Sequence, residues 1–178
     1  NNTVKNTIVE GAVTSTANGV ILFSTSTGTL GNSNNAITNN DIRDRSDLTA
    51  VFANAIYSSG TASALNASDT ISGNNIFNFN SSGMNLASTG MGDNWQITNN
   101  NIYNAQATAS AATQNGIVIG GGIGQTVTGN FVGGNAAGAT GLWTNSGNVI
   151  VTGILLTGGV ATISNNTIAN ITTTNTGT

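Results

Sequence analysis

The chain has 178 residues, of which 38% are hydrophobic and 5% are charged, and its net charge at pH 7 is −3. The absence of His and Cys excludes disulfides, thiolate catalysis, Cys-type zinc sites and a histidine base, and no metal or cofactor is predicted. With only three basic residues, Lys5, Arg43 and Arg45, the chain is not expected to bind nucleic acid.

A six-residue pattern recurs along the chain and reads Ile/Val, Ser/Thr, Asn/Gly, Asn, any residue, Ile/Val. A degenerate copy occupies residues 4–9, and five closer copies follow at 37–42, 71–76, 97–102, 127–132 and 163–168. The first residues of successive copies are 33, 34, 26, 30 and 36 residues apart. Such variable spacing is typical of a solenoid whose turns carry loops of different length. Because Asn, Thr, Ser and Gly are poor helix formers, essentially no α-helix is expected.

Each copy of the pattern predicts two short strands on either side of a sharp bend. The first and sixth residues are expected to fill a shared core, and the Asn at the fourth position is expected to adopt the left-handed conformation of the bend. Stacked turns then align the fourth-position side chains in an asparagine ladder. Its predicted members are Asn40, Asn74, Asn100, Asn130 and Asn166.

Between the copies lies a further strand, usually introduced by Gly. Strand alternation predicts that six of its side chains point inward: Val20, Ile56, Met84, Ile117, Leu142 and Ile154. The outward positions then form a mostly apolar column, which includes Ile21, Tyr57, Val118, Trp143 and Leu155. Contiguous exposed apolar residues indicate an interface, so this column is expected to pack against a neighbouring solenoid or beneath a loop.

The repeated motif resembles the parallel β-helix repeat of pectate-lyase-like proteins and of many bacterial secreted and surface proteins, and it covers nearly the whole chain. The resemblance implies an all-β fold, a right-handed parallel β-helix of about six turns in a single domain over residues 1–178. It implies no particular activity, because that superfamily includes lyases, hydrolases, adhesins and inert stalks. An antiparallel sandwich or propeller remains the alternative, with Asn18-Gly19 and Asn115-Gly116 as hairpin turns.

Residues 41–47 hold five of the nine formal charges. Lyases and hydrolases of the resembled fold use grouped carboxylates, with Ca²⁺ or a basic residue in the lyases. Later turns add only Asp69 and Asp93, outside the motif, so the cluster is interpreted as an exposed ion-paired corner and the chain as a non-enzyme. A polysaccharide lyase or hydrolase is the alternative.

Two outward columns raise binding hypotheses. Arg43, Phe77 and Tyr103 follow the motif on successive turns, about 4.8 Å apart, and could form a strip that binds a sugar ring. The alternative is that residues 78–80 or the insertion 105–114 cover them. The second motif position forms one Thr/Ser column, Thr38, Ser72, Thr98, Thr128 and Ser164, which raises ice binding as a third hypothesis, although one column is not a surface.

The leading functional hypothesis is an extracellular structural or adhesive rod of a bacterial surface. Low charge with abundant Asn and Thr is typical of secreted surface proteins. No capping helix is predicted at either end, so the chain is expected to be a segment of a longer protein or to self-associate, end to end or laterally. A carbohydrate-binding or carbohydrate-active β-helix, with polysaccharide as partner, is the alternative. No apolar run is long enough to span a bilayer.

Overall fold

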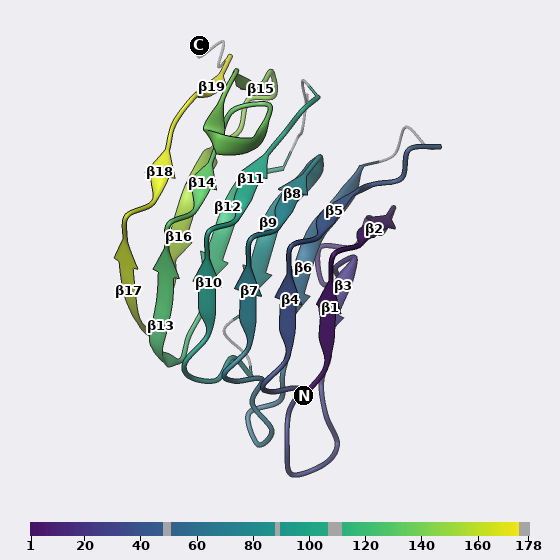
Figure 1. Cartoon of the computed structure of the whole chain (residues 1–178), viewed down its shortest axis with the longest axis vertical. Helices are drawn as coiled ribbons and strands as arrows, with labels where there is room; N and C mark the ends of the chain where they lie inside the picture. Colours follow the sequence, from purple (N-terminus) through teal and green to yellow (C-terminus); the bar gives the residue numbers. More distant parts are fainter. Residues whose placement is uncertain (48–50, 88–89, 107–111, 175–178) are drawn as a thin grey trace.

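The computed structural model describes residues 1–47, 51–87, 90–106 and 112–174, and its strands form a parallel β-solenoid of about five turns. Consecutive strands along the chain lie in different sheets, and each strand pairs with the strand in the same place one turn later (Figure 1). All pairs between named strands are parallel. The predicted all-β solenoid is confirmed and the antiparallel alternative is wrong: Asn115 and Gly116 lie inside a strand.

Three sheets, named A, B and C, contain most of the strands. Sheet A consists of β1 (Thr3–Lys5), β4 (Ala36–Thr38), β7 (Thr70–Ser72), β10 (Gln96–Thr98), β13 (Ile123–Thr128) and β17 (Val160–Ser164). Sheet B consists of β2 (Ile8–Gly11), β5 (Asp41–Asp44), β8 (Asn75–Phe77), β11 (Asn101–Tyr103), β14 (Phe131–Val132) and β18 (Thr167–Ile168). Sheet C consists of β3 (Ile21–Phe23), β6 (Phe52–Ser58), β9 (Phe79–Leu86), β12 (Gln114–Ile119) and β16 (Val151–Leu156).

Two smaller elements complete the described part of the chain. Strand β15 (Trp143–Asn145) pairs with β19 (Ile171–Thr173) in a separate two-stranded sheet. A short 3₁₀ helix, η1 (Ala137–Ala139), is the only helical segment among the described residues. The expected near-absence of helix is therefore confirmed.

Apolar columns from the three sheets fill the interior. The first motif residue supplies the column of sheet A: Val4, Ile37, Ile71, Ile97, Val127 and Ile163. The sixth supplies that of sheet B: Val9, Ile42, Ile76, Ile102, Val132 and Ile168. In the four middle turns these side chains are at most 2% exposed, so each contributes about 1.5–3 kcal/mol of apolar burial.

The bend between sheets A and B lies at the third motif residue and not at the fourth, so that prediction is wrong. Asn39 and Asn99 have φ of 55° and 56°, and Gly73 and Gly129 have φ of 68° and 69°. Asn and Gly are the residues that adopt this left-handed conformation at least cost. The fourth residue stays out of that region because its side chain points into the interior, where the ladder forms.

Sheet C corrects one prediction about which side chains point outward. Ile21 pairs with Ile56 and therefore belongs to the inward column, while Leu22 pairs with Tyr57 on the outward side. Val20 precedes the strand and also packs against the core, so the alternation begins only at Ile21.

Trp143 was predicted to point outward, and this is also wrong. It is 0% exposed, whereas Leu142, predicted to point inward, is 50% exposed. The chain forms the additional strand β15 here instead of joining sheet C directly, and this reverses the alternation. The Trp143 ring packs edge-on against Phe79, with ring centroids 5.3 Å apart.

Candidate functional site

The predicted asparagine ladder is present and runs through the interior beside the bend. The backbone N–H and the side-chain Nδ2 of each member donate to Oδ1 of the member one turn later, at 2.9–3.0 Å, from Asn40 to Asn166. The other Nδ2 proton donates to a backbone carbonyl one turn earlier, as from Asn100 to Ile71 at 2.9 Å. The ladder therefore ties each turn to both of its neighbours.

A second, shorter ladder precedes sheet A and ends in a carboxylate. Asn2 donates through N and Nδ2 to Asn35 Oδ1, and Asn35 donates through N and Nδ2 to Asp69 Oδ1 at 2.8 and 2.9 Å. Asp69 is 0% exposed, and its Oδ2 has no hydrogen-bond partner among the described residues. Burial raises the pKa of Asp69 to about 6, although the two donors of Asn35 lower it. The sequence did not predict this buried role, because Asp69 lies outside the motif.

The charged corner contains two ion pairs. Arg43 Nη2 lies 2.8 Å from Glu10 Oε1, which is one turn earlier in sheet B. Arg45 Nη2 lies 2.6 Å from Asp47 Oδ2, and both of these side chains are exposed. The hydrogen bond to Arg45 lowers the pKa of Asp47.

The other two carboxylates of the corner accept hydrogen bonds from later turns. Asp44 is 8% exposed and accepts from Asn78 Nδ2 at 2.8 Å and from Gln106 Nε2 at 3.2 Å. Asp41 accepts from Asn75 Nδ2 at 2.8 Å. These contacts give both carboxylates a role in holding turns together.

The predicted strip of Arg43, Phe77 and Tyr103 lies on the outward side of sheet B. The rings of Phe77 and Tyr103 stack face to face, with centroids 4.8 Å apart and planes 6° from parallel. One face of each ring is thus already used by the other ring. Burial, followed by the charge of Asp41, raises the pKa of Tyr103. Part of the insertion 105–114 lies outside the described residues, so sugar binding by the strip stays a prediction.

The outward column of sheet C is partly covered. Its members are Leu22, Tyr57, Asn85, Val118 and Leu155. Leu22 is 41% exposed, whereas Val118 is 9% exposed. A lateral interface through Tyr57, Val118 and Leu155 stays a prediction. Ile21 and Trp143 are not part of it, because both side chains point inward.

Sheet A presents a second threonine column that sequence analysis missed. The outward residue that follows each first-motif residue is Lys5, Thr38, Ser72, Thr98, Thr128 or Ser164. The outward residue that precedes it is Thr3, Ala36, Thr70, Gln96, Thr126 or Thr162. None of these twelve side chains is buried. The missed signal was a hydroxyl residue on both sides of the first motif residue, as in Thr126, Val127 and Thr128.

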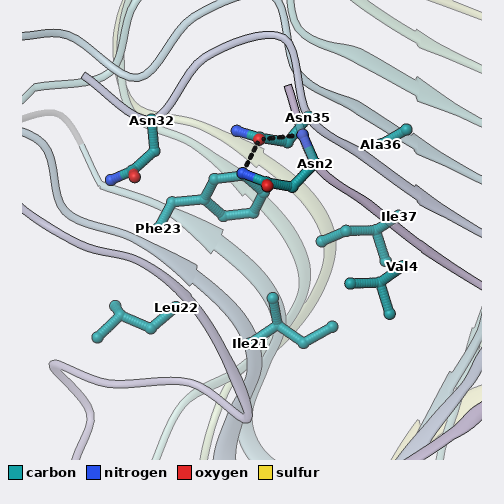
Figure 2. A pocket seen from close by; sticks show the side chains of 9 residues that line it. All are labelled: Asn2, Val4, Ile21, Leu22, Phe23, Asn32, Asn35, Ala36 and Ile37. Atoms are coloured by element: carbon teal, nitrogen blue, oxygen red, sulfur yellow. Dashed lines mark hydrogen bonds between the residues drawn. The ribbon is translucent and has the colours of Figure 1, made fainter. Parts of the chain in front are cut away.

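A cavity of about 160 Å³ lies at the first turn. Figure 2 shows the apolar side chains of Val4, Ile21 and Ile37 around it, with Asn2 and Asn35 hydrogen-bonded to each other. No titratable side chain lines it. The cavity therefore offers apolar packing and amide hydrogen bonds.

Within the described ranges, no group of three His, Cys, Asp or Glu side chains could hold a metal ion. No helix in the same part of the chain is both long and apolar enough to cross a membrane. Comparisons with family models, with curated proteins and with solved structures gave no match. The structure therefore supports the resemblance stated above at the level of a parallel β-solenoid.

Proposed function

We propose that this chain is a structural β-solenoid, a stiff segment of a rod or filament outside a bacterial cell. The observation that carries the proposal is the asparagine ladder, which repeats the same hydrogen bonds from turn to turn. Because each turn contacts mainly its neighbours, such a fold lengthens by adding turns. The resemblance to the repeat of bacterial surface proteins and the low charge support the location.

The two end turns expose side chains that the middle turns bury. Val4 in the first turn is 37% exposed, and Ile163 and Ile168 in the last are 43% and 52% exposed. Strands β1 and β17 lie at the two edges of sheet A and each has one edge without a strand partner in the described part of the chain. Unpaired parallel edges beside apolar side chains are surfaces that another turn can cover, whether from the same chain or from another copy.

The motif register indicates how a second copy would dock on the last turn. Val4 of that copy would lie opposite Ile163, as Val4 lies opposite Ile37 within the chain. Thr7 occupies the ladder position of the first turn, since its N–H donates to Asn40 Oδ1 at 3.2 Å. The Thr7 hydroxyl of the second copy could then accept from Asn166, and the ladder would continue across the junction.

Sedimentation velocity and electron microscopy over a range of protein concentrations test the proposal. The wild type should associate as concentration rises and form particles that lengthen without widening. Ile163→Lys should weaken association, because it places a charge in the exposed end of the inward column. Thr126→Lys, on the outward side of sheet A in a middle turn, is the matched control and should associate like the wild type. A wild type that stays monomeric at every concentration would contradict the proposal, as would equal association of Ile163→Lys and the wild type.

A further inference from the structure

We propose that the outward face of sheet A binds the surface of ice. This face consists of the two columns that flank the first-motif residues, and nine of its twelve side chains are Thr or Ser. The only charged residue among the twelve is Lys5, in the first strand. The proposal is independent of end-to-end association, because the face runs along the side of the solenoid.

The parallel register turns the two columns into a regular two-dimensional array. Neighbouring members of a column are about 4.8 Å apart, and the two columns are separated by two residues along each strand, or about 6.6 Å. Both repeats lie near the spacings of oxygen atoms on a prism face of ice. Thr is stiff at χ1, so its hydroxyl and methyl groups can repeat with one orientation along a column.

Hydroxyl groups of adjacent turns already contact one another on this face. Thr98 Oγ1 donates to Ser72 Oγ at 2.9 Å, and the hydroxyls of Thr128 and Ser164 are 3.2 Å apart. These bonds restrain four hydroxyl oxygens before water binds and hold them closer together than the strands. The regular repeat of about 4.8 Å therefore belongs to the backbone positions of both columns and to the other column, that of Thr70, Thr126 and Thr162. An ordered water layer can therefore form on the face with little loss of side-chain freedom.

No described segment buries the face, and the other two sheets lack its uniformity. The strands of sheet A lie side by side in Figure 1, in the order β1, β4, β7, β10, β13, β17. The outward side of sheet B mixes charged and aromatic residues such as Arg43 and Tyr103, and that of sheet C carries large apolar residues such as Leu22. Among the described strands, only those of sheet A repeat small hydroxyl side chains from turn to turn on their outward side, and this is the chemistry that matches ice.

Ice incorporation and thermal hysteresis of three variants test the proposal. Labelled wild-type protein should concentrate in a slowly growing ice shell, above an inert protein of similar size. Thr98→Tyr should reduce incorporation to the level of the inert protein, because a large ring in the middle of the face prevents flat contact. Asn85→Tyr is the matched control, since Tyr57 already occupies the same column of sheet C, and it should behave like the wild type.

A gain-of-function variant keeps the test informative if Thr98→Tyr fails to fold, which circular dichroism would show. Gln96 interrupts the column between Thr70 and Thr126, so Gln96→Thr should increase thermal hysteresis. Wild-type incorporation no higher than that of the inert protein would overturn the proposal. So would a Gln96→Thr variant with no increase over the wild type. A face that instead joins copies laterally would lose sedimentation-detected association in Thr98→Tyr while ice incorporation stays at baseline, which also overturns ice binding.

Discussion

At the scale of single residues, Asn100 shows how one side chain joins three turns. Its Oδ1 accepts two hydrogen bonds from Asn74, while its Nδ2 donates to the Ile71 carbonyl of the preceding turn and to Asn130 Oδ1 of the next. The side chain is 0% exposed, so water cannot replace any of these contacts. A buried amide of this kind stabilises the fold mainly because its partners would otherwise be left unpaired.

Asn100→Ala should therefore lower the free energy of unfolding by about 3 kcal/mol or more, since a buried donor or acceptor left unpaired costs roughly 1–3 kcal/mol. The matched control is Asn101→Ala, one residue later. Asn101 faces outward, donates to Asn75 and is half-buried, so water can replace its contacts at a cost of about 1 kcal/mol or less. Urea unfolding at constant pH measures both values. Equal destabilisation by the two variants would contradict the structural role of the ladder.

Asp69 gives the chain a pH dependence whose sign follows from the raised pKa of this buried carboxyl. Its pKa is raised to about 6, mainly by burial, so the folded state binds the proton more tightly than the unfolded state does. Stability is then greatest below the unfolded pKa of about 3.9 and falls as the pH rises towards 6, by roughly 3 kcal/mol in all. Above the folded pKa it no longer changes through this group.

Asp69→Asn should remove this dependence, because the amide keeps the acceptor for Asn35 and carries no charge. The difference in unfolding free energy between the variant and the wild type should grow in favour of the variant from pH 4 to pH 6. Taking that difference cancels the titration of the other carboxylates. Denaturant unfolding at several pH values measures it, and a difference that stays constant over this range would count against the buried charge.

At the scale of elements, the bend residue between sheets A and B alternates between Asn and Gly from Asn39 onward. Asn39 is followed one turn later by Gly73, and Asn99 is followed by Gly129. A Cβ added to Gly73 would meet Oδ1 of Asn39, and one added to Gly129 would meet Oδ1 of Asn99. The alternation thus leaves space for each Asn side chain over the next turn.

Gly73→Ala should destabilise the fold by about 1 kcal/mol or more, because it combines positive φ with this contact. Asn39→Gly, at the same bend one turn earlier, should lower the free energy of unfolding by only a few tenths of a kcal/mol, apart from the extra conformational entropy that Gly gives the unfolded chain. In the double variant the contact with Oδ1 is absent, so part of the Gly73→Ala cost should be recovered. Thermal unfolding of the four proteins gives the coupling energy, and strict additivity would contradict the contact.

At the scale of the whole molecule, the motif predicted the features that a local sequence pattern specifies. The first and sixth residues, separated by a bend, specify inward columns in sheets A and B, and the buried Asn specifies the ladder. Sheet C has no such motif, so its alternation depends on where each strand begins, and Ile21 was misplaced by one residue. Trp143 was misplaced because its strand pairs with β19, a partner 28 residues later that no local pattern reveals.

The outward faces were the least predictable part of the molecule. Solvent-facing residues leave no hydrophobic period, so the column of Thr70 and Thr126 is found in the sequence only by aligning the residue that precedes each motif copy. The stacking of Phe77 on Tyr103 likewise follows from register, although its use as a binding strip does not. The register between turns therefore determines which polar residues share a surface.

Disulfide trapping tests the stacked parallel register most directly, because the chain contains no Cys of its own. Ser72 and Thr98 are partners on adjacent turns, with hydroxyls 2.9 Å apart, so Ser72→Cys with Thr98→Cys should form a disulfide rapidly on mild oxidation of the folded protein. Ser72→Cys with Thr128→Cys spans two turns, or about 9.6 Å, which exceeds the reach of a disulfide, so it should remain reduced. Equal crosslinking of both pairs, or crosslinking of the two-turn pair alone, would contradict the solenoid.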